Sequence, residues 1–282
     1  MAKKDKKPVE PKYIPSSLNN PMINYRVYYM SLGQKISYSL AIFTLGGIAG
    51  NIFYGGLFRV DGENTVATYI SNLVVFFVVG LIALKFFIPL LTQRLKQKRD
   101  KQLKKQFIDL MEAVSTSLSA GNTVSDSFIN ARSDLLNQYS PSDMIVVELS
   151  EIVTGMDNGK TLEEMMNAFG ERSGNEDIEN FANVINNCFR LGGNFKDVVK
   201  KMRDVIADKM AVADEIETKL ASNKLQHNAM SVMPIVLVGM IKMMNPTFAE
   251  NLASPIGIVV VTISIAIFIG SYIWGRKIID IR

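Results

Sequence analysis

The sequence predicts an all-α, polytopic membrane protein with a cytoplasmic six-helix domain, built of helical hairpins, between two transmembrane hairpins. Three observations support this prediction. Four long apolar runs stand in two pairs that flank a charged middle segment. The middle segment repeats apolar residues at helical spacing and has no alternating strand pattern of useful length. Three turns of the same chemistry divide that segment into helices.

The apolar runs cover residues 36–58, 69–91, 229–244 and 256–274. The first two have 23 residues each, about 34 Å of helix, which is enough to cross the ~30 Å hydrocarbon core of a bilayer. The fourth run has 19 residues without a charge and also qualifies. The third has only 16 residues and contains Lys242. It spans only if its helix begins further upstream and the lysine reaches a headgroup.

Two features inside the runs have more than one interpretation. Gly46 and Gly50 are four residues apart, which either allows another helix to approach closely or reflects the ordinary tolerance of glycine in spans. Lys85 lies in the second run, where we expect its ammonium group to reach out to the membrane surface rather than to line an ion pathway.

Lysine and arginine residues indicate the orientation of these spans. They cluster before the first run, after the second and after the fourth, whereas the loop 245–255 has none. Both termini and the middle segment are therefore expected in the cytoplasm, in a multi-pass protein of the cytoplasmic (inner) membrane. The net charge of +4 and the pI near 9 follow from this bias and from attraction to anionic membrane lipid, so no nucleic-acid partner is predicted.

The charge and hydropathy pattern predicts five segments. They are a basic, partly disordered N-terminal segment at 1–35, a transmembrane hairpin at 36–91, a cytoplasmic helical domain at 92–228, a second transmembrane hairpin at 229–275 and a cytoplasmic tail at 276–282. Within the first segment, residues 1–20 are rich in lysine and proline and are expected to be disordered, and residues 21–35 are expected at the membrane surface.

Three turns in the middle segment share one pattern, and they read GNTVSD at 121–126, GKTLEE at 159–164 and GGNFKD at 192–197. In each, a glycine ends one helix, a threonine or asparagine two residues later caps the next helix, and an acidic residue three positions further on completes a capping box. The intervals of 38 and 33 residues indicate a repeat of helical hairpins. The predicted structural hinge residues are Gly121, Thr123, Asp126, Gly159, Thr161, Glu164, Gly192, Asn194 and Asp197. No helix breaker separates Asn194 from Pro234, so the last helix is expected to continue into the third run.

The sequence predicts no catalytic, cofactor-binding or metal site. GMDNGKT at 155–161 imitates a phosphate-binding loop, but only three residues separate its glycines where four are needed. A single cysteine, Cys188, and a single histidine, His227, allow neither an internal disulfide nor a multi-histidine metal site. Acidic pairs such as Glu163 and Glu164 fall on solvent faces without a partner. We therefore expect a protein that is not an enzyme and needs no cofactor.

The ordered turns carry a family likeness. The segments LSAG at 118–121, GKTLEEMM at 159–166 and LGGNFKDVV at 191–199, in helices between two membrane hairpins, resemble the type II secretion system F domain. The layout is similar to the inner-membrane platform proteins of tight-adherence (Tad-type) pili. The likeness covers roughly residues 60–282. This chain has one F domain, whereas the double-domain secretion platforms have two, and that difference fits the Tad type, in which two related proteins are thought to pair.

The resemblance implies a function and a set of partners. A platform protein sits at the base of a pilus or secretion machine, contacts a hexameric cytoplasmic ATPase and passes its movement to pilin subunits in the membrane. A paralogous platform protein or a second copy of the chain is the expected neighbour. Two alternatives stay open at this point: a membrane transporter, which would need polar residues at the membrane midplane, and a generic membrane-anchored helical adaptor.

Overall fold

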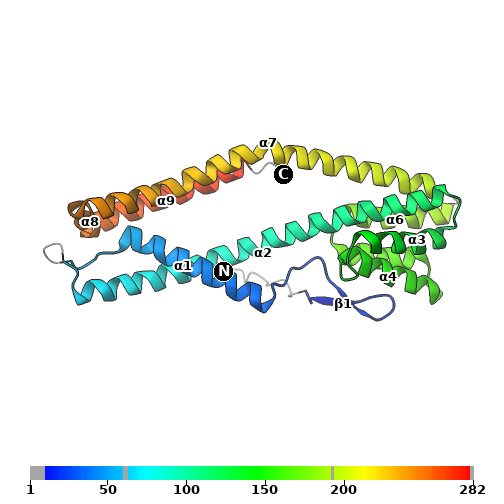
Figure 1. Cartoon of the computed structure of the whole chain (residues 1–282), viewed down its shortest axis with the longest axis horizontal. Helices are drawn as coiled ribbons and strands as arrows, with labels where there is room; N and C mark the ends of the chain where they lie inside the picture. The colour runs from blue at the N-terminus through cyan, green and yellow to red at the C-terminus, as the bar shows by residue number, and fades with distance from the viewer. Residues whose placement is uncertain (1–9, 60–62, 192–193, 280–282) are drawn as a thin grey trace, which may run out of the picture. The chain divides into compact units, whose positions relative to one another are not determined.

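The computed structural model describes residues 10–59, 63–191 and 194–279, and within them the chain is almost wholly helical (Figure 1). The predicted all-α class is confirmed for this part of the chain. The helices are α1 (Leu32–Tyr54), α2 (Val66–Ser119), α3 (Val124–Gln138), α4 (Met144–Asp157), α5 (Leu162–Ser173), α6 (Glu176–Leu191), α7 (Phe195–Met244), α8 (Pro246–Ala253) and α9 (Pro255–Ile279).

The chain separates into two compact units. Residues 1–29 and 92–213 form the first, which we call the helical unit and which is described from residue 10 onward. Residues 30–91 and 214–282 form the second, which we call the apolar unit. Two long helices, α2 and α7, contribute residues to both units.

Among the described residues, four helices are long and apolar enough to cross a membrane by length and composition: α1, α2, α7 and α9. The first begins at Leu32, four residues before the predicted run, because Ser31 and Gln34 form a reciprocal capping box that starts the helix in polar sequence. The predicted second span and the first helix of the middle segment are one helix, α2, since the Lys, Arg and Gln residues that join them are good helix formers. The predicted continuity of the last helix is confirmed, because α7 runs without a break through Pro234.

Close packing joins α1 to α2 within the apolar unit. A Cβ atom added to Gly46 would lie 2.6 Å from Cβ of Ala83, and one added to Gly50 would lie 2.8 Å from Cβ of Val79. The neighbouring Gly47 faces the ring of Phe76 in the same way. The structure therefore favours the close-approach interpretation of these glycines over ordinary tolerance.

Lys242 on α7 takes a different role from the predicted one. Its ammonium group donates to the carbonyl oxygens of Asn51, Ile52 and Gly55 at the end of α1, with 3.2 Å to Ile52 O. The last carbonyls of a helix have no partner within the helix and carry partial negative charge, so a cation stabilises them. The expectation that Lys242 reaches a headgroup is wrong, because these carbonyls satisfy its donors inside the protein.

The loop predicted at 245–255 also contains a helix. Asn245 caps α8 by accepting a hydrogen bond from the backbone N–H of Phe248 at 3.1 Å, and Pro246 occupies the first helical position. Ser254 then ends α8, and its hydroxyl accepts from Gly257 N at 3.0 Å as α9 begins. The connection between the last two apolar helices is thus a short capped helix.

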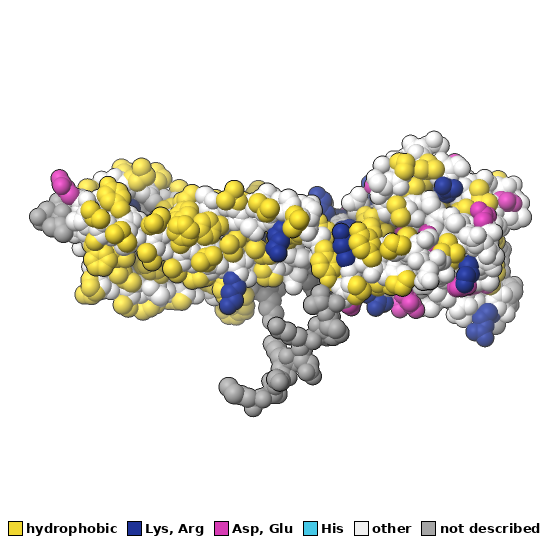
Figure 2. All heavy atoms as spheres, turned by 90° about the horizontal axis from the view of Figure 1, so that it is seen from below, with side chains coloured by type: hydrophobic (Ala, Val, Ile, Leu, Met, Phe, Trp, Pro, Cys, Tyr) yellow, Lys and Arg dark blue, Asp and Glu magenta, His cyan; other side chains and the backbone are white. Residues whose placement is uncertain are grey.

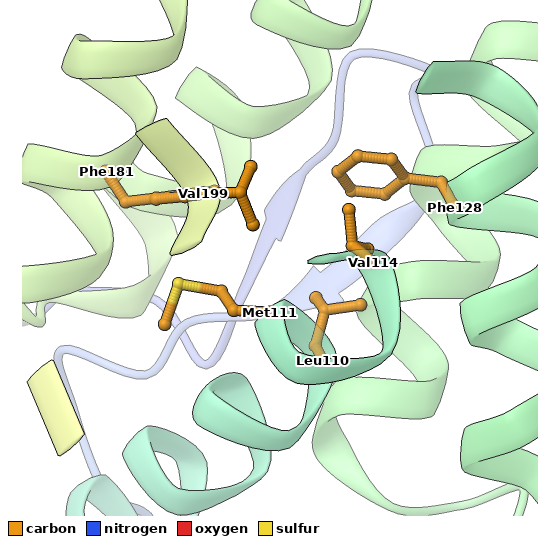
Figure 3. Close-up of a pocket in the computed structure, with 6 residues that line it drawn as sticks. All are labelled: Leu110, Met111, Val114, Phe128, Phe181 and Val199. Atoms are coloured by element: carbon orange, nitrogen blue, oxygen red, sulfur yellow. The ribbon is translucent and has the colours of Figure 1, made fainter. Parts of the chain in front are cut away.

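The helical unit encloses one apolar core to which α2, α3, α4, α5, α6 and the start of α7 contribute. Figure 3 shows six side chains from four of these helices that line a small internal cavity. They are Leu110, Met111 and Val114 of α2, Phe128 of α3, Phe181 of α6 and Val199 of α7. The cavity has no room for a water molecule, as in a close-packed protein interior.

An amino-terminal segment, residues 10–29, packs on the helical unit, and we call it the strap. It contains the only strands in the described residues, β1 (Tyr13–Pro15) and β2 (Pro21–Ile23), which pair antiparallel with Ile14 opposite Met22. The expected disorder is wrong for residues 10–20, and the expected membrane-surface position is wrong for Tyr25, which is 1% exposed in the core. Residues 1–9, which include the lysine-rich start, lie outside the described part of the chain.

Candidate functional site

The first predicted turn joins α2 to α3. Gly121 has φ +89°, a left-handed conformation that L-residues with a side chain rarely adopt, and its N–H bonds to Leu118 O. Thr123 is the N-cap of α3, and its hydroxyl accepts from Asp126 N at 3.1 Å. The Asp126 carboxylate accepts from that same hydroxyl at 2.7 Å rather than from the backbone of the cap. The predicted capping box is therefore half formed here.

The second predicted turn joins α4 to α5. Gly159 has φ +79°, and Thr161 caps α5 by accepting from Glu164 N at 3.2 Å. The Glu164 carboxylate pairs with Lys160 at 2.8 Å on the exposed side of the turn. This box is also half formed, because a cation four residues before the acid competes for the carboxylate.

The third predicted turn precedes α7. Gly192 and its neighbour Gly193 lie outside the described residues. The side-chain amide of Asn194 donates to the Asp197 carboxylate at 2.8 Å, and Asn194 O accepts from Val198 N as α7 begins. The hydrogen bonds of the described turn residues are made with the turn itself or with its flanking helices. Gly121 and Gly159 follow the ends of α2 and α4, and Thr123 and Thr161 cap α3 and α5. The role of the whole set as structural hinges stays a prediction.

The phosphate-loop imitation folds as a helix end. Gly155 is buried inside α4 against Met165 of α5, and a side chain at this position would collide with that methionine. The backbone N–H groups that would have to surround a phosphate are already bonded. Lys160 N donates to Gly155 O at 2.9 Å, and Gly159 N donates to Met156 O at 3.0 Å. A phosphate-binding loop needs such N–H groups free, so this segment is not one.

The most unusual chemistry in the helical unit is a pair of buried glutamates on α4. Glu148 is 0% exposed, and its carboxylate pairs with Arg172 of α5 at 2.6 Å. The Tyr25 hydroxyl of the strap lies near the same carboxylate, but in the described residues neither that hydroxyl nor Glu148 Oε1 has a hydrogen-bond partner. Burial raises the pKa of Glu148 because desolvation outweighs the attraction of Arg172 and the Tyr25 contact, and nearby Glu151 adds to the rise. Burial and the Glu148 charge also raise the pKa of Tyr25.

The second glutamate, Glu151, lies one turn further along α4 and is 8% exposed. Its carboxylate accepts a hydrogen bond from the Ser16 hydroxyl and another from the side-chain amide of Asn20, the latter at 3.0 Å. Both donors belong to the turn between the two strands of the strap. Uncharged donors therefore satisfy this carboxylate, and every one of them comes from the amino-terminal segment.

Arg99 of α2 completes the attachment of the strap. Its guanidinium donates to Tyr25 O at 2.8 Å and to Val27 O at 3.0 Å, and it lies over the rings of Tyr25 and Tyr28. Arg26 in turn donates to Glu171 O at 2.7 Å, at the end of α5. An arginine suits this site because its planar group can bond two carbonyls and stack on rings at once.

We call Glu148, Glu151, Arg172, Arg99 and Tyr25 the clasp. The sequence analysis missed it, although one signal was present. Glu148 falls within the apolar stripe of α4, between Ile145 and Ile152, where an acidic residue is buried and must find a partner. The identity of that partner could not be read from the sequence, because Arg172 lies on the next helix, 24 residues further along the chain.

Other surfaces offer little chemistry. A depression of about 380 Å³ on the apolar unit is lined by Leu57, Phe58, Ala67, Ile70, Ser71, Val74 and Val75. Its one hydroxyl, Ser71, already donates to Thr68 O at 2.9 Å, so the depression has no group to orient a polar ligand. In the part of the chain that the structure describes, there is no group of three or more His, Cys, Asp or Glu residues that could hold a metal ion.

Comparison of the chain with protein-family models, with curated proteins and with solved structures finds no match.

Proposed function

We propose that this protein is an inner-membrane platform for the assembly of a Tad-type or type IV-like pilus, or of a type II-like secretion machine. In this role it couples a cytoplasmic ATPase to the export of pilin subunits. One observation carries the proposal. A unit of capped helical hairpins, with left-handed glycines at Gly121 and Gly159, is inserted in the chain between two pairs of apolar helices. That order of parts is the one on which the family resemblance rests.

The chemistry of the two units supports a mechanical role. The core of the helical unit is closed by apolar side chains. Of its buried charges, Glu148 pairs with Arg172, and Glu151 is hydrogen-bonded by the strap. A protein that transmits movement needs a rigid body with polar outer faces that a partner can contact. It does not need a reaction centre. The exposed helix faces of this unit are the proposed contacts for the ATPase and for a sister platform protein.

Lys242 bears on the transporter alternative. A solute-binding lysine within a membrane would have to offer its ammonium group to a cavity or to the solute. Here that group donates to three carbonyl oxygens at the end of α1. The contacts favour a structural role for Lys242 and so support the platform over a transporter.

Cysteine accessibility tests the topology on which the proposal depends. In a Cys188→Ala background, a cysteine at Glu63, Ser140 or Glu250 would be exposed for labelling. We expect Ser140→Cys to react with a membrane-impermeant maleimide only after the cells are opened, and Glu63→Cys and Glu250→Cys to react in intact cells. Labelling of Ser140→Cys in intact cells would exclude a cytoplasmic helical unit and with it the proposed function.

Partner binding is the second test. The full-length protein in nanodiscs, rather than an isolated 92–228 fragment, is mixed with the hexameric assembly ATPase of the same cell. The full chain is needed because the strap fills part of the core of the helical unit. We expect co-elution that is lost when exposed positions of the helical unit are masked by biotin–streptavidin at both Asp134→Cys on α3 and Lys200→Cys on α7. If no complex forms with any assembly ATPase of the cell, the coupling role is wrong.

A further inference from the structure

The strap is docked on the helical unit by polar and apolar contacts. Its turn bonds Glu151 through Ser16 and Asn20, and its aromatic anchor Tyr25 is buried in the apolar core. Tyr25 N also donates to Arg172 O at 2.9 Å. Three helices, α2, α4 and α5, therefore hold this segment through the clasp. A segment that only covered the surface would not bury Tyr25 in the core or supply the donors of the buried Glu151 carboxylate.

The docked strap ends next to the first apolar helix. Arg99 holds the carbonyl oxygen of Val27, and α1 begins five residues later at Leu32. Five residues span at most roughly 18 Å even when fully extended. Chain length alone thus limits how far the start of α1 can lie from Val27 while the strap is docked, in any arrangement of the two units.

We propose that the strap is a tether that couples the helical unit to the first apolar helix, and that the clasp keeps this tether docked. The strap is the chain segment directly before α1. When the strap is released, the short chain between Val27 and Leu32 no longer holds the start of α1 near the helical unit. The chain then connects the units only within α2 and α7. The inference rests on the contacts of the strap and not on the proposed function, so either can fail without the other.

Hydrogen exchange on the full-length protein in nanodiscs tests the clasp. We expect the backbone amides of residues 12–27 to be protected in the wild type. In Tyr25→Ala their protection should fall on the order of a hundredfold, as expected for loss of a buried aromatic side chain. The matched control is Tyr13→Ala, which alters the same residue type in the same segment at a side chain that is 49% exposed. Unprotected wild-type amides, or full protection in Tyr25→Ala, would overturn the clasp.

Distance measurement between spin labels tests the tether. The labels are placed at Leu32→Cys and Asp134→Cys in a Cys188→Ala background, and both positions are exposed. We expect Tyr25→Ala to broaden the distribution of label distances and Tyr13→Ala to leave it unchanged. An unchanged distribution in a variant whose strap is released would overturn the tether.

A second variant covers the case in which Tyr25→Ala unfolds the helical unit. A specific protease site inserted between Tyr29 and Met30 allows the connection to be cut while the clasp is intact. After cleavage we expect the amides of the strap to stay protected and the label distances to broaden. Loss of strap protection on cleavage would show that the clasp does not hold the strap by itself, and unchanged distances would show that the strap restrains nothing.

Discussion

The helical unit buries its large apolar side chains, whereas the apolar unit exposes them on its surface. In the helical unit, large apolar residues such as Phe107 and Phe169 are fully buried and the charges lie mainly outside. In the apolar unit, the most apolar stretches of the four long helices have between 0% and 11% of their residues buried, and apolar side chains cover much of the face seen in Figure 2. The difference is compatible with a helical unit that faces water and an apolar unit that faces lipid.

Different forces must therefore stabilise the two units. Water drives the apolar side chains of the helical unit together. Apolar side chains that face lipid gain little from meeting each other, so membrane helices depend on close packing and hydrogen bonds. The apolar unit has both kinds of contact, in the glycines of α1 that face α2 and in the bond of 3.1 Å between the hydroxyls of Tyr54 and Thr262.

The largest effect is expected from two phenylalanines on the same helix. Phe107 is 0% exposed in the helical unit, and Phe87 is 57% exposed in the apolar unit, and both belong to α2. Phe107→Ala should lower the free energy of unfolding by about 3–5 kcal/mol, because it leaves a cavity in a packed core. Phe87→Ala should change it by less than about 1 kcal/mol. Thermal unfolding in detergent measures both. Equal effects would contradict the assignment of different solvents to the two units.

An introduced lysine should have the larger effect in the apolar unit and the smaller effect in the helical unit. Ile267→Lys places an ammonium group in the middle of α9 at an exposed apolar position, which should disfavour membrane insertion by about 3 kcal/mol. Leu136→Lys in α3, at a side chain that is 40% exposed, should stay within about 0.5 kcal/mol of the wild type. The fraction of protein that resists carbonate extraction from membranes reports the first effect, and thermal unfolding reports the second. Normal insertion of Ile267→Lys would argue that α9 does not face lipid.

A smaller difference in stability is expected between two glycines, one in each unit. A Cβ atom at Gly121 or at Gly270 would meet nothing within 4 Å, but only Gly121 has a left-handed backbone. Gly121→Val should therefore cost about 1 kcal/mol or more from backbone strain alone. Gly270→Val in α9 should cost less, because its backbone is helical and its surroundings are open. The shift in unfolding temperature of each variant measures this difference, and equal shifts would remove the case for Gly121 as a hinge.

The smallest effect concerns pH. Burial alone would raise the pKa of Asp177, but hydrogen bonds and charges from Lys104 at 2.6 Å and Lys209 at 2.9 Å outweigh it and lower the pKa below its ordinary value of 3.8. A lowered pKa in the folded state contributes stability that is present above the unfolded-state value and is lost as the pH falls through the folded-state value. Asp177→Asn should cost roughly 1 kcal/mol at pH 7.

Urea unfolding of the wild type and of Asp177→Asn at a series of pH values checks this expectation. The difference between the two curves should be constant near neutral pH and shrink only below about pH 4. A difference that grows on acidification would have the wrong sign and would mean that Asp177 is not held in its charged form by the two lysines.

Much of the fold follows from local pattern. Apolar periodicity, Thr123 and Thr161 as caps, and the absence of breakers after Asn194 were enough to predict the helices and the continuity of α7. The junctions between elements were less predictable. Lysine and glutamine suit both a loop and a solvated helix, so the run of these residues after the second span did not decide whether a loop or a continuous helix follows.

The strap and the clasp could not be predicted in this way. Pro15 and Pro21 delimit strands of three residues, which are too short for alternation to be recognised. Tyr25 looks like a membrane-surface aromatic until its surroundings are known, and Arg172, whose carbonyl oxygen accepts from Tyr25 N, lies more than a hundred residues away. Contacts of that kind depend on how the helices stack and not on any local spacing.

By itself, the sequence determined which stretches are helical and which of them are apolar enough to cross a membrane, since both follow from neighbours three or four residues apart. Only the tertiary structure decided where the isolated polar groups go. It placed Lys242 on the end of α1 and the amino-terminal segment on Glu148 and Glu151. The physical reason is that a buried charge must find a partner, and close packing rather than chain position determines which partner is within reach.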